Sequence, residues 1–163
     1  MSNYVYPRNF SRKELIHSDT ASRKGIDNSP VSNEHERNLT LLAYFLQDLR
    51  DRLSKHYKRE VVIFISSGYR SPDLNAAIGG AKRSAHLIGA AADIRCKGLS
   101  VKEVCSFIKN HCSDLLFDQV IDEYDSWVHV GVKQPTTNLQ RRQFLQARKV
   151  KGKTQYTPID YFF

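Results

Sequence analysis

The chain has 163 residues, of which 40% are hydrophobic and 26% charged, which is typical of one folded domain rather than of a disordered chain. A helix that spans a bilayer needs roughly 20 apolar residues, and the longest apolar run has five, so we expect no membrane span. Of the net charge of +8, residues 133–163 carry +6, which excludes an evenly charged surface. The first residues lack the apolar core of a secretory signal, which predicts a protein that is cytoplasmic at synthesis.

The N-terminal part of the chain is predicted to contain two helices and a loop. Ser11 and Glu14 have the spacing of a capping box, which favours a short helix from this point. Residues 15–32 are polar and include glycine and proline, so we expect a loop. Leucines then recur at spacings of three and four over residues 34–57, which predicts a long helix with one apolar face, and Asn33 is its expected N-cap.

The middle of the chain alternates between short strand and helix patterns. Residues 61–66 are apolar and β-branched and predict a buried strand. Ser71 followed by Pro72 is typical of a helix start, and two glycines at 79–80 are expected to end that helix. A further strand is expected over residues 91–95.

The next segment is predicted to contain a helix and two paired strands. Ser100 and Glu103 repeat the capping-box spacing and start a helix that ends near residue 111. Residues 117–123 and 127–132 predict two strands that are joined by a tight turn. Because helices and strands mix without a regular βαβ repeat, the predicted class is α+β, with helices packed on a small antiparallel sheet.

The charge distribution suggests a boundary after residue 132. We predict a main domain over residues 1–132 and a basic C-terminal tail over residues 133–163, in which seven Lys and Arg residues face a single Asp. Such a tail attracts polyanions, either nucleic acid or an anionic wall polymer, and the alternative is a solvated tail without a partner. The three cysteines (Cys96, Cys105 and Cys112) include no CxxC pair and predict reduced, buried thiols.

Three residues form a candidate metal site. His86 and Asp93 bracket small and apolar residues that let the chain fold back closely, and His129 is expected on the strand face opposite Val128 and Val130. Two imidazoles and a carboxylate suit Zn²⁺ and leave the fourth position to water. The alternative is a surface histidine at 86 and a core histidine at 129.

The motifs ISSGYRS at 65–71, SAHLIGAAAD at 84–93 and WVHV at 127–130 resemble the M15 family of zinc peptidases. That family contains D-alanyl-D-alanine carboxypeptidases and phage endolysins, and it shares a fold with the amino-terminal signalling domain of hedgehog proteins. The resemblance covers roughly residues 10–132. It implies a hedgehog/DD-peptidase-like fold with His86, Asp93 and His129 as zinc ligands. It also implies that Arg70 lines the substrate site, where it would hold a substrate carboxylate or an oxyanion.

Some roles stay open at the level of sequence. Arg70 has a structural ion pair as its alternative role, and Ser84 either contacts substrate or caps its loop. Many family members carry an acidic general base three residues before the last histidine, where this chain has Ser126. We therefore expect Glu123, and second Asp125, to act as the base, while the alternative is that both acids lie exposed in the turn.

The function that this resemblance implies is hydrolysis of stem or cross-link peptides of peptidoglycan. The chain would be a D-Ala-D-Ala carboxypeptidase or an endolysin-like endopeptidase, encoded by a phage or prophage, and would reach the cell wall after lysis or as a virion component. The rival interpretation is a zinc-containing wall-binding module without catalysis. A nucleic-acid-binding protein ranks last because no reading motif is present.

Overall fold

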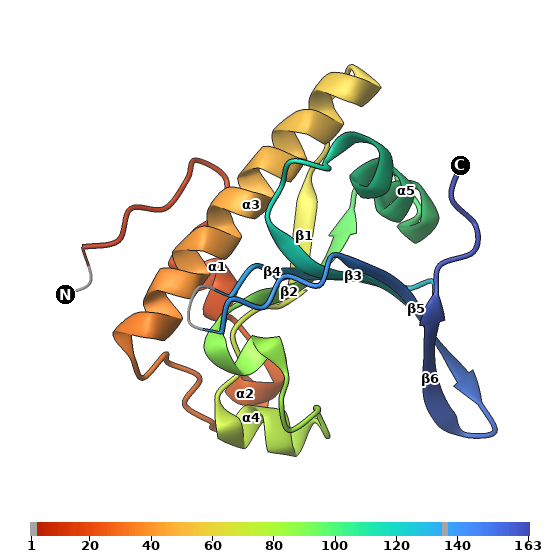
Figure 1. Cartoon of the computed structure of the whole chain (residues 1–163). Helices are drawn as coiled ribbons and strands as arrows, with labels where there is room; N and C mark the ends of the chain where they lie inside the picture. The colour runs from red at the N-terminus through yellow and green to blue at the C-terminus, as the bar shows by residue number, and fades with distance from the viewer. Residues whose placement is uncertain (1–2, 135–136) are drawn as a thin grey trace.

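The computed structural model describes residues 3–134 and 137–163, and these residues form helices packed on a six-stranded sheet (Figure 1). In chain order the elements are α1 (Arg12–Ile16), α2 (Asp19–Lys24), α3 (Asn33–Tyr57), β1 (Ile63–Ser67), α4 (Pro72–Ala77), the 3₁₀ helix η1 (Ala85–Ile88), β2 (Ala91–Cys96), α5 (Val101–His111), β3 (Phe117–Glu123), β4 (Trp127–Val132), β5 (Gln143–Val150) and β6 (Lys153–Pro158).

The sheet has the order β1-β2-β4-β3-β5-β6 and is mostly antiparallel. The predicted α+β class is confirmed. One pairing departs from the expected antiparallel sheet, because β5 runs parallel to β3. The centre of the sheet is formed by β2, β4 and β3, so the residues of these strands have neighbours on both sides.

The two faces of the sheet differ in what covers them. Val128 and Val130 of β4 point into the main core, where they join the inner leucines of α3 and the apolar side of α5. The leucines predicted to form the inner face of the long helix are fully buried, namely Leu39, Leu42, Leu46, Leu49 and Leu53. Side chains alternate along a strand, so His129 of β4 points to the other face. We call this second face the site face.

The N-terminal segment contains one helix more than the sequence pattern predicts. The expected loop over residues 15–32 is wrong in part, because Asp19–Lys24 forms α2. The Ser18 side chain accepts a hydrogen bond from the Ala21 N–H at 3.1 Å and so caps this helix. Its N3 residue is Ala21 rather than Glu or Gln, so the capping-box spacing that marks α1 and α5 is missing here. The N-cap of α3 is Ser32 and not Asn33, since the Ser32 hydroxyl accepts from the His35 N–H.

Other elements agree with the sequence patterns. The strands β3 and β4 have the predicted bounds, and α5 begins with a complete capping box of Ser100 and Glu103. The three cysteines are free and buried, as expected. None of the helices in the described part of the chain combines the length and hydropathy that a bilayer span requires.

The segment that its charge sets apart as a tail is joined to the main sheet. Residues in β5 and β6 extend the sheet beyond β3, and Ile159 is buried while Tyr161 and Phe162 pack against the core. Part of the positive charge is neutralised internally. Arg141 pairs with the buried Asp118 at 2.7 Å, and Arg148 pairs with the buried Asp122 at 2.8 Å. A charge count along the chain misses these pairs because both aspartates precede residue 132.

Candidate metal centre

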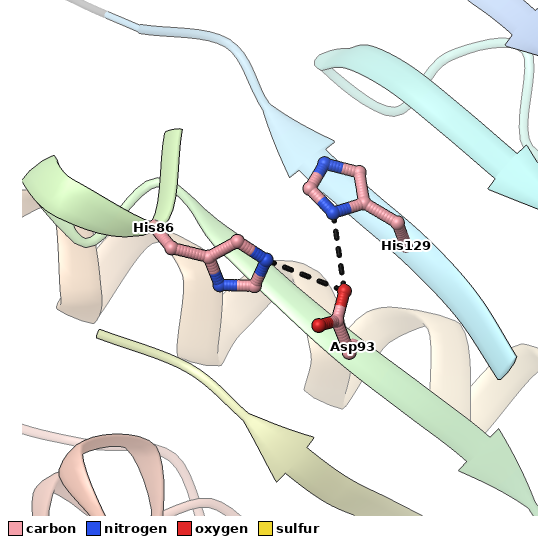
Figure 2. Close-up of side chains that lie close together, drawn as sticks. All are labelled: His86, Asp93 and His129. Carbon is pink, nitrogen blue, oxygen red and sulfur yellow. Dashed lines mark hydrogen bonds and ion pairs between the residues drawn. The ribbon is translucent and has the colours of Figure 1, made fainter. Parts of the chain in front are cut away.

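The three predicted ligands meet on the site face (Figure 2). Asp93 of β2 and His129 of β4 are directly paired across the two strands, so their side chains leave the sheet side by side. His86 reaches them from η1. The Asp93 Oδ1 atom lies 3.1 Å from Nδ1 of His129 and 3.3 Å from Nε2 of His86. All three residues are buried, with exposed fractions between 2% and 9%.

A short turn that is tied to the neighbouring helix places His86. The Ser84 hydroxyl caps η1 by accepting from the His86 N–H at 3.3 Å. Gly89 ends the turn with φ of +75°, and a Cβ at this position would lie 2.9 Å from the His35 carbonyl oxygen of α3. Only glycine therefore combines this backbone conformation with the close approach to α3. The Asn38 amide of α3 donates to the Ile88 carbonyl at 2.9 Å and also ties the turn to this helix.

The hydrogen bond that His86 makes with its other ring nitrogen, Nδ1, determines the protonation of the nitrogen that faces Asp93. Nδ1 of His86 lies 2.7 Å from the Gly68 carbonyl oxygen. A carbonyl oxygen only accepts, so Nδ1 carries the proton and donates it. In the neutral ring Nε2 then has a lone pair and no proton, and that nitrogen is directed at Asp93.

The protonation states are consistent with this assignment. Burial lowers the pKa of His86, although the negative charge of Asp93 opposes the shift, so the ring is neutral at neutral pH. Burial opposes the ionisation of Asp93, but its pKa is lowered, with His129 as a hydrogen-bond partner of Oδ1 and the Arg70 guanidinium donating to Oδ2, so the carboxylate is ionised. A lone pair of His86 Nε2 thus faces a negatively charged oxygen. Such an arrangement is repulsive unless a cation lies between the two atoms.

The spacing of the three side chains also suits a metal ion. A tetrahedral site with bonds of about 2.0–2.1 Å separates its ligand atoms by about 3.3–3.4 Å. The two distances from Asp93 Oδ1 are close to this value. The rings of His86 and His129 have centroids 5.1 Å apart, and Figure 2 shows one nitrogen of each ring directed at Asp93. The group could therefore hold a metal ion without rearrangement of the backbone.

Arg70 lies next to the cluster and makes an ion pair with it. Its Nη2 donates to Asp93 Oδ2 at 3.0 Å, and its Nε donates to the Ser67 hydroxyl at 2.9 Å. The ion pair that sequence analysis gives as the alternative role of Arg70 is thus present. The same contact places the guanidinium at the rim of the candidate metal centre, and 13% of its side chain is exposed.

Sequence reasoning did not assign a role to Gly68, although it lies in the ISSGYRS motif. A Cβ at Gly68 would lie 2.1 Å from the Leu15 carbonyl oxygen of α1. The Tyr69 N–H donates to the same Leu15 oxygen at 2.8 Å, so the chain here is pressed against α1. This packing holds the Gly68 carbonyl in place for His86. The only sequence signal for this role of Gly68 is its position inside the ISSGYRS motif.

The structure places the two candidate bases differently. Glu123 is at the end of β3 opposite Trp127, on the same face as the Ile121–His129 pair, and therefore lies on the site face. Burial raises its pKa, and the charge of Asp93 raises it further, although His129 and Arg70 act in the opposite direction. Asp125 is exposed in the β3–β4 turn.

Asp125 borders a cavity of about 290 Å³ that is also lined by Val104 of α5 and by Val128. Val128 belongs to the face opposite His129, so Asp125 lies on the α5 side of the sheet. Ser126, at the position where many family members carry the acid, accepts a hydrogen bond from Arg95 through its carbonyl. Of the two acids, the structure brings only Glu123 close to the candidate metal centre.

Comparison with known proteins adds one finding. A sequence model of the family described as Peptidase M15 matches residues 8–131. The matched region contains all three members of the cluster, together with Arg70, Ser84 and Glu123, and it ends before β5 and β6. No curated protein matches the chain.

Proposed function

The chain belongs to the peptidase M15 family, and on this premise we propose that it is a zinc-dependent peptidase that hydrolyses cell-wall peptides. The observation that carries the proposal is the buried contact between the lone pair of His86 Nε2 and the ionised Asp93, with His129 beside them. Two imidazoles and one carboxylate are a donor set that zinc accepts in catalytic sites. His86, Asp93 and His129 would hold the ion.

The chemistry follows from the groups around the ligands. Zinc, when bound, supplies a Lewis acid that makes a water molecule more acidic and polarises the carbonyl of the scissile bond. Glu123 accepts the proton of the attacking water at its carboxylate and returns it to the leaving amine. Its raised pKa favours this double role, because the protonated form is reached at a smaller cost than for an ordinary glutamate.

Arg70 provides positive charge beside the reacting atoms. Its contact with Asp93 Oδ2 orients the guanidinium, and two of its five N–H groups make the bonds to Asp93 and Ser67. We propose that other N–H groups stabilise the oxyanion or hold a substrate carboxylate. Ser84 is placed here as the cap of η1, and a contact with substrate remains a prediction for that residue.

The proposed substrate is a stem or cross-link peptide of peptidoglycan that contains D-amino acids. The support for it is the family membership together with the motifs that resemble D-Ala-D-Ala carboxypeptidases and phage endolysins. We propose an origin in a phage or prophage on the same resemblance, with action on the wall after lysis or from a virion. The residues described above are compatible with carboxypeptidase or endopeptidase cleavage.

The test is hydrolysis of a defined peptidoglycan by the zinc-loaded protein. New amino groups should appear, and the masses of the released fragments identify the bond that is cut. A chelator, His129→Ala and Glu123→Gln should each stop the release, while Asp125→Asn should leave it unchanged. A protein that binds zinc and wall material but releases no amino group would instead be the non-catalytic binding module. Ser126 at the usual place of the acid is the observation that favours this second candidate.

A separate proposal concerns the basic residues of the β5–β6 hairpin. Lys149, Lys151 and Lys153 are exposed around its turn and can attract an anionic wall polymer or nucleic acid. Replacing the three lysines by glutamine should weaken retention on purified cell walls and reduce the salt dependence of that retention. Equal retention of the variant at low salt would remove this proposal.

A further inference from the structure

The β5–β6 hairpin extends the sheet from β3, the strand that carries Glu123. Within the parallel β3–β5 pair, Glu123 is opposite Ala147, and within the hairpin Ala147 is opposite Tyr156. Paired residues point to the same face of a sheet. Tyr156 therefore lies on the site face, two strands away from Glu123, although the family match ends at residue 131.

The residue between them is small and covered. Ala147 is fully buried, whereas Tyr156 is 56% exposed. The methyl side chain of Ala147 is too short to separate the side chains of β3 and β6, so these side chains can approach each other above it. Burial raises the pKa of Tyr156, and the negative charges of Glu123 and Asp93 add to the shift, in agreement with a ring that is turned toward the candidate metal centre.

The hairpin is fastened to the turn next to the site. The Tyr124 hydroxyl lies 2.7 Å from the Thr154 hydroxyl of β6, and the Tyr124 N–H donates to the Ala147 carbonyl at 3.1 Å. Tyr124 also packs edge to face on Trp127, with ring centroids 5.7 Å apart. In Figure 1 the hairpin extends past the sheet toward the level of α4, on the side away from α5. The arrangement gives the site face a second border, opposite η1.

We propose that the β5–β6 hairpin forms this border of the substrate site and that Tyr156 is a positioning residue of the peptidase. The ring would pack against the aliphatic part of the peptide residue that is bound next to the scissile bond. A half-exposed aromatic ring offers a large contact area with few rotatable bonds, and it is held by a strand rather than by a mobile loop. The inference rests on the proposed function, because the occupant of the site is the cell-wall peptide named there.

The kinetic test compares three variants on a soluble stem peptide. Tyr156→Ala should raise KM about tenfold and change kcat less than about twofold, because the ring contact is made equally in the ground state and the transition state. Tyr156→Phe keeps the ring and should have a KM close to that of the wild type. Gln155→Ala is the matched control, since Gln155 is exposed on the same strand and points to the opposite face. An unchanged KM for Tyr156→Ala, or a Phe variant as weak as the Ala variant, would overturn the assignment.

A binding measurement separates this inference from the proposed function. Calorimetry of the same stem peptide with zinc-loaded Glu123→Gln protein should give a Kd about ten times higher when Tyr156→Ala is added to the variant. If the wild type never hydrolyses the peptide but binding still depends on Tyr156, the peptidase proposal fails and the border of the site is retained. If hydrolysis occurs and neither KM nor Kd depends on Tyr156, the peptidase proposal holds and the role of the hairpin is refuted.

Discussion

Two buried aspartates on opposite faces of the same sheet have different surroundings. Asp122 of β3 points to the core side, where Arg148 donates to both of its oxygens, Tyr161 O–H donates to Oδ2 and the Asp125 N–H donates to Oδ1. Asp93 of β2 points to the site face, where Arg70 donates to Oδ2 but Oδ1 faces the unprotonated Nε2 of His86. Both carboxylates are ionised, and burial opposes ionisation in both.

The comparison shows why burial and charge alone do not identify a functional carboxylate. All the neighbours of Asp122 named above are donors, so the protein itself satisfies this charge. Asp93 has Arg70 as a donor to Oδ2 and the His129 ring beside Oδ1. The unprotonated Nε2 of His86 also faces Oδ1, however, and a cation between these two atoms would relieve their repulsion. The same residue type on one sheet is therefore a structural anchor on one face and a candidate metal ligand on the other.

The largest expected effect comes from removal of a ligand on the site face. His86→Ala and Asp93→Asn should each abolish stoichiometric zinc binding and lower peptidase activity by about 10³-fold or more, because the metal contributes several kcal/mol to the reaction. Zinc content is measured by metal analysis of the folded protein after dialysis. Asp122→Asn is the control and should keep its zinc. Full zinc content in His86→Ala would contradict the assignment.

Removal of the Asp122 carboxylate on the core side of the sheet should lower the stability of the protein rather than its zinc binding. In Asp122→Ala the half-buried Arg148 and the Tyr161 hydroxyl lose their acceptor, and we expect the free energy of unfolding to fall by about 1–3 kcal/mol. Urea denaturation measures this loss. The exposed Asp114, which pairs with Arg52 at the surface, offers a matched control in which Asp114→Ala changes stability little. A comparable loss for the two variants would show that burial of Asp122 is not the cause.

The role of the Gly68 carbonyl can be tested without touching a ligand. In Gly68→Ala the Cβ would collide with the Leu15 carbonyl and displace the acceptor of His86 Nδ1. Zinc affinity should fall about 10–100-fold, which is typical for the loss of a group that orients a ligand. Gly25→Ala alters another glycine, which has positive φ and open space around it, and should leave the affinity unchanged while α2 is destabilised. Equal affinity of the two variants would remove the proposed role.

The smallest effect concerns the pH dependence of stability. Burial opposes ionisation of Asp122, but hydrogen bonds from Arg148 and Tyr161 prevail and lower its pKa in the folded protein. The unfolded chain then takes up protons first on acidification, so the stabilisation is present above the ordinary aspartate pKa and is lost as the pH falls through the folded value. Asp122→Asn should therefore lose less stability between pH 7 and pH 3 than the wild type in urea titrations. Identical losses would argue against a lowered pKa.

Several features were predictable because they depend on neighbours along the chain. The leucine spacing of α3 and the capping box of α5 are local patterns, and these helices are where the sequence places them. The bounds of β3 and β4 also follow from local alternation. The helix α2 was not predicted because its capping pattern is incomplete. The strands β5 and β6 were not predicted because polar and basic residues interrupt the apolar alternation that is typical of a strand.

The candidate site was likewise predictable only in part. The residue types of His86, Asp93 and His129 already indicate a metal, and their motifs resemble one family. The preference for Glu123 over Asp125 as the base depended at the level of sequence on the family resemblance alone, because both acids lie within six residues of His129, and the position of each acid relative to the cluster was open. It depends on the side of the sheet to which each residue turns, which the strand pairing and the tight turn decide.

The amino-acid sequence by itself determined the class of fold, most of the helices and the three residue types that can bind a metal. Only the tertiary structure decided that Asp93 is paired with His129, that the Gly68 carbonyl orients His86, and that β5 brings Tyr156 to the site face. The physical reason is the distance along the sequence between the residues that interact. Helix caps and periodicities are set by residues a few positions apart, whereas register, burial and hydrogen-bond partners arise between segments that meet only when the chain folds.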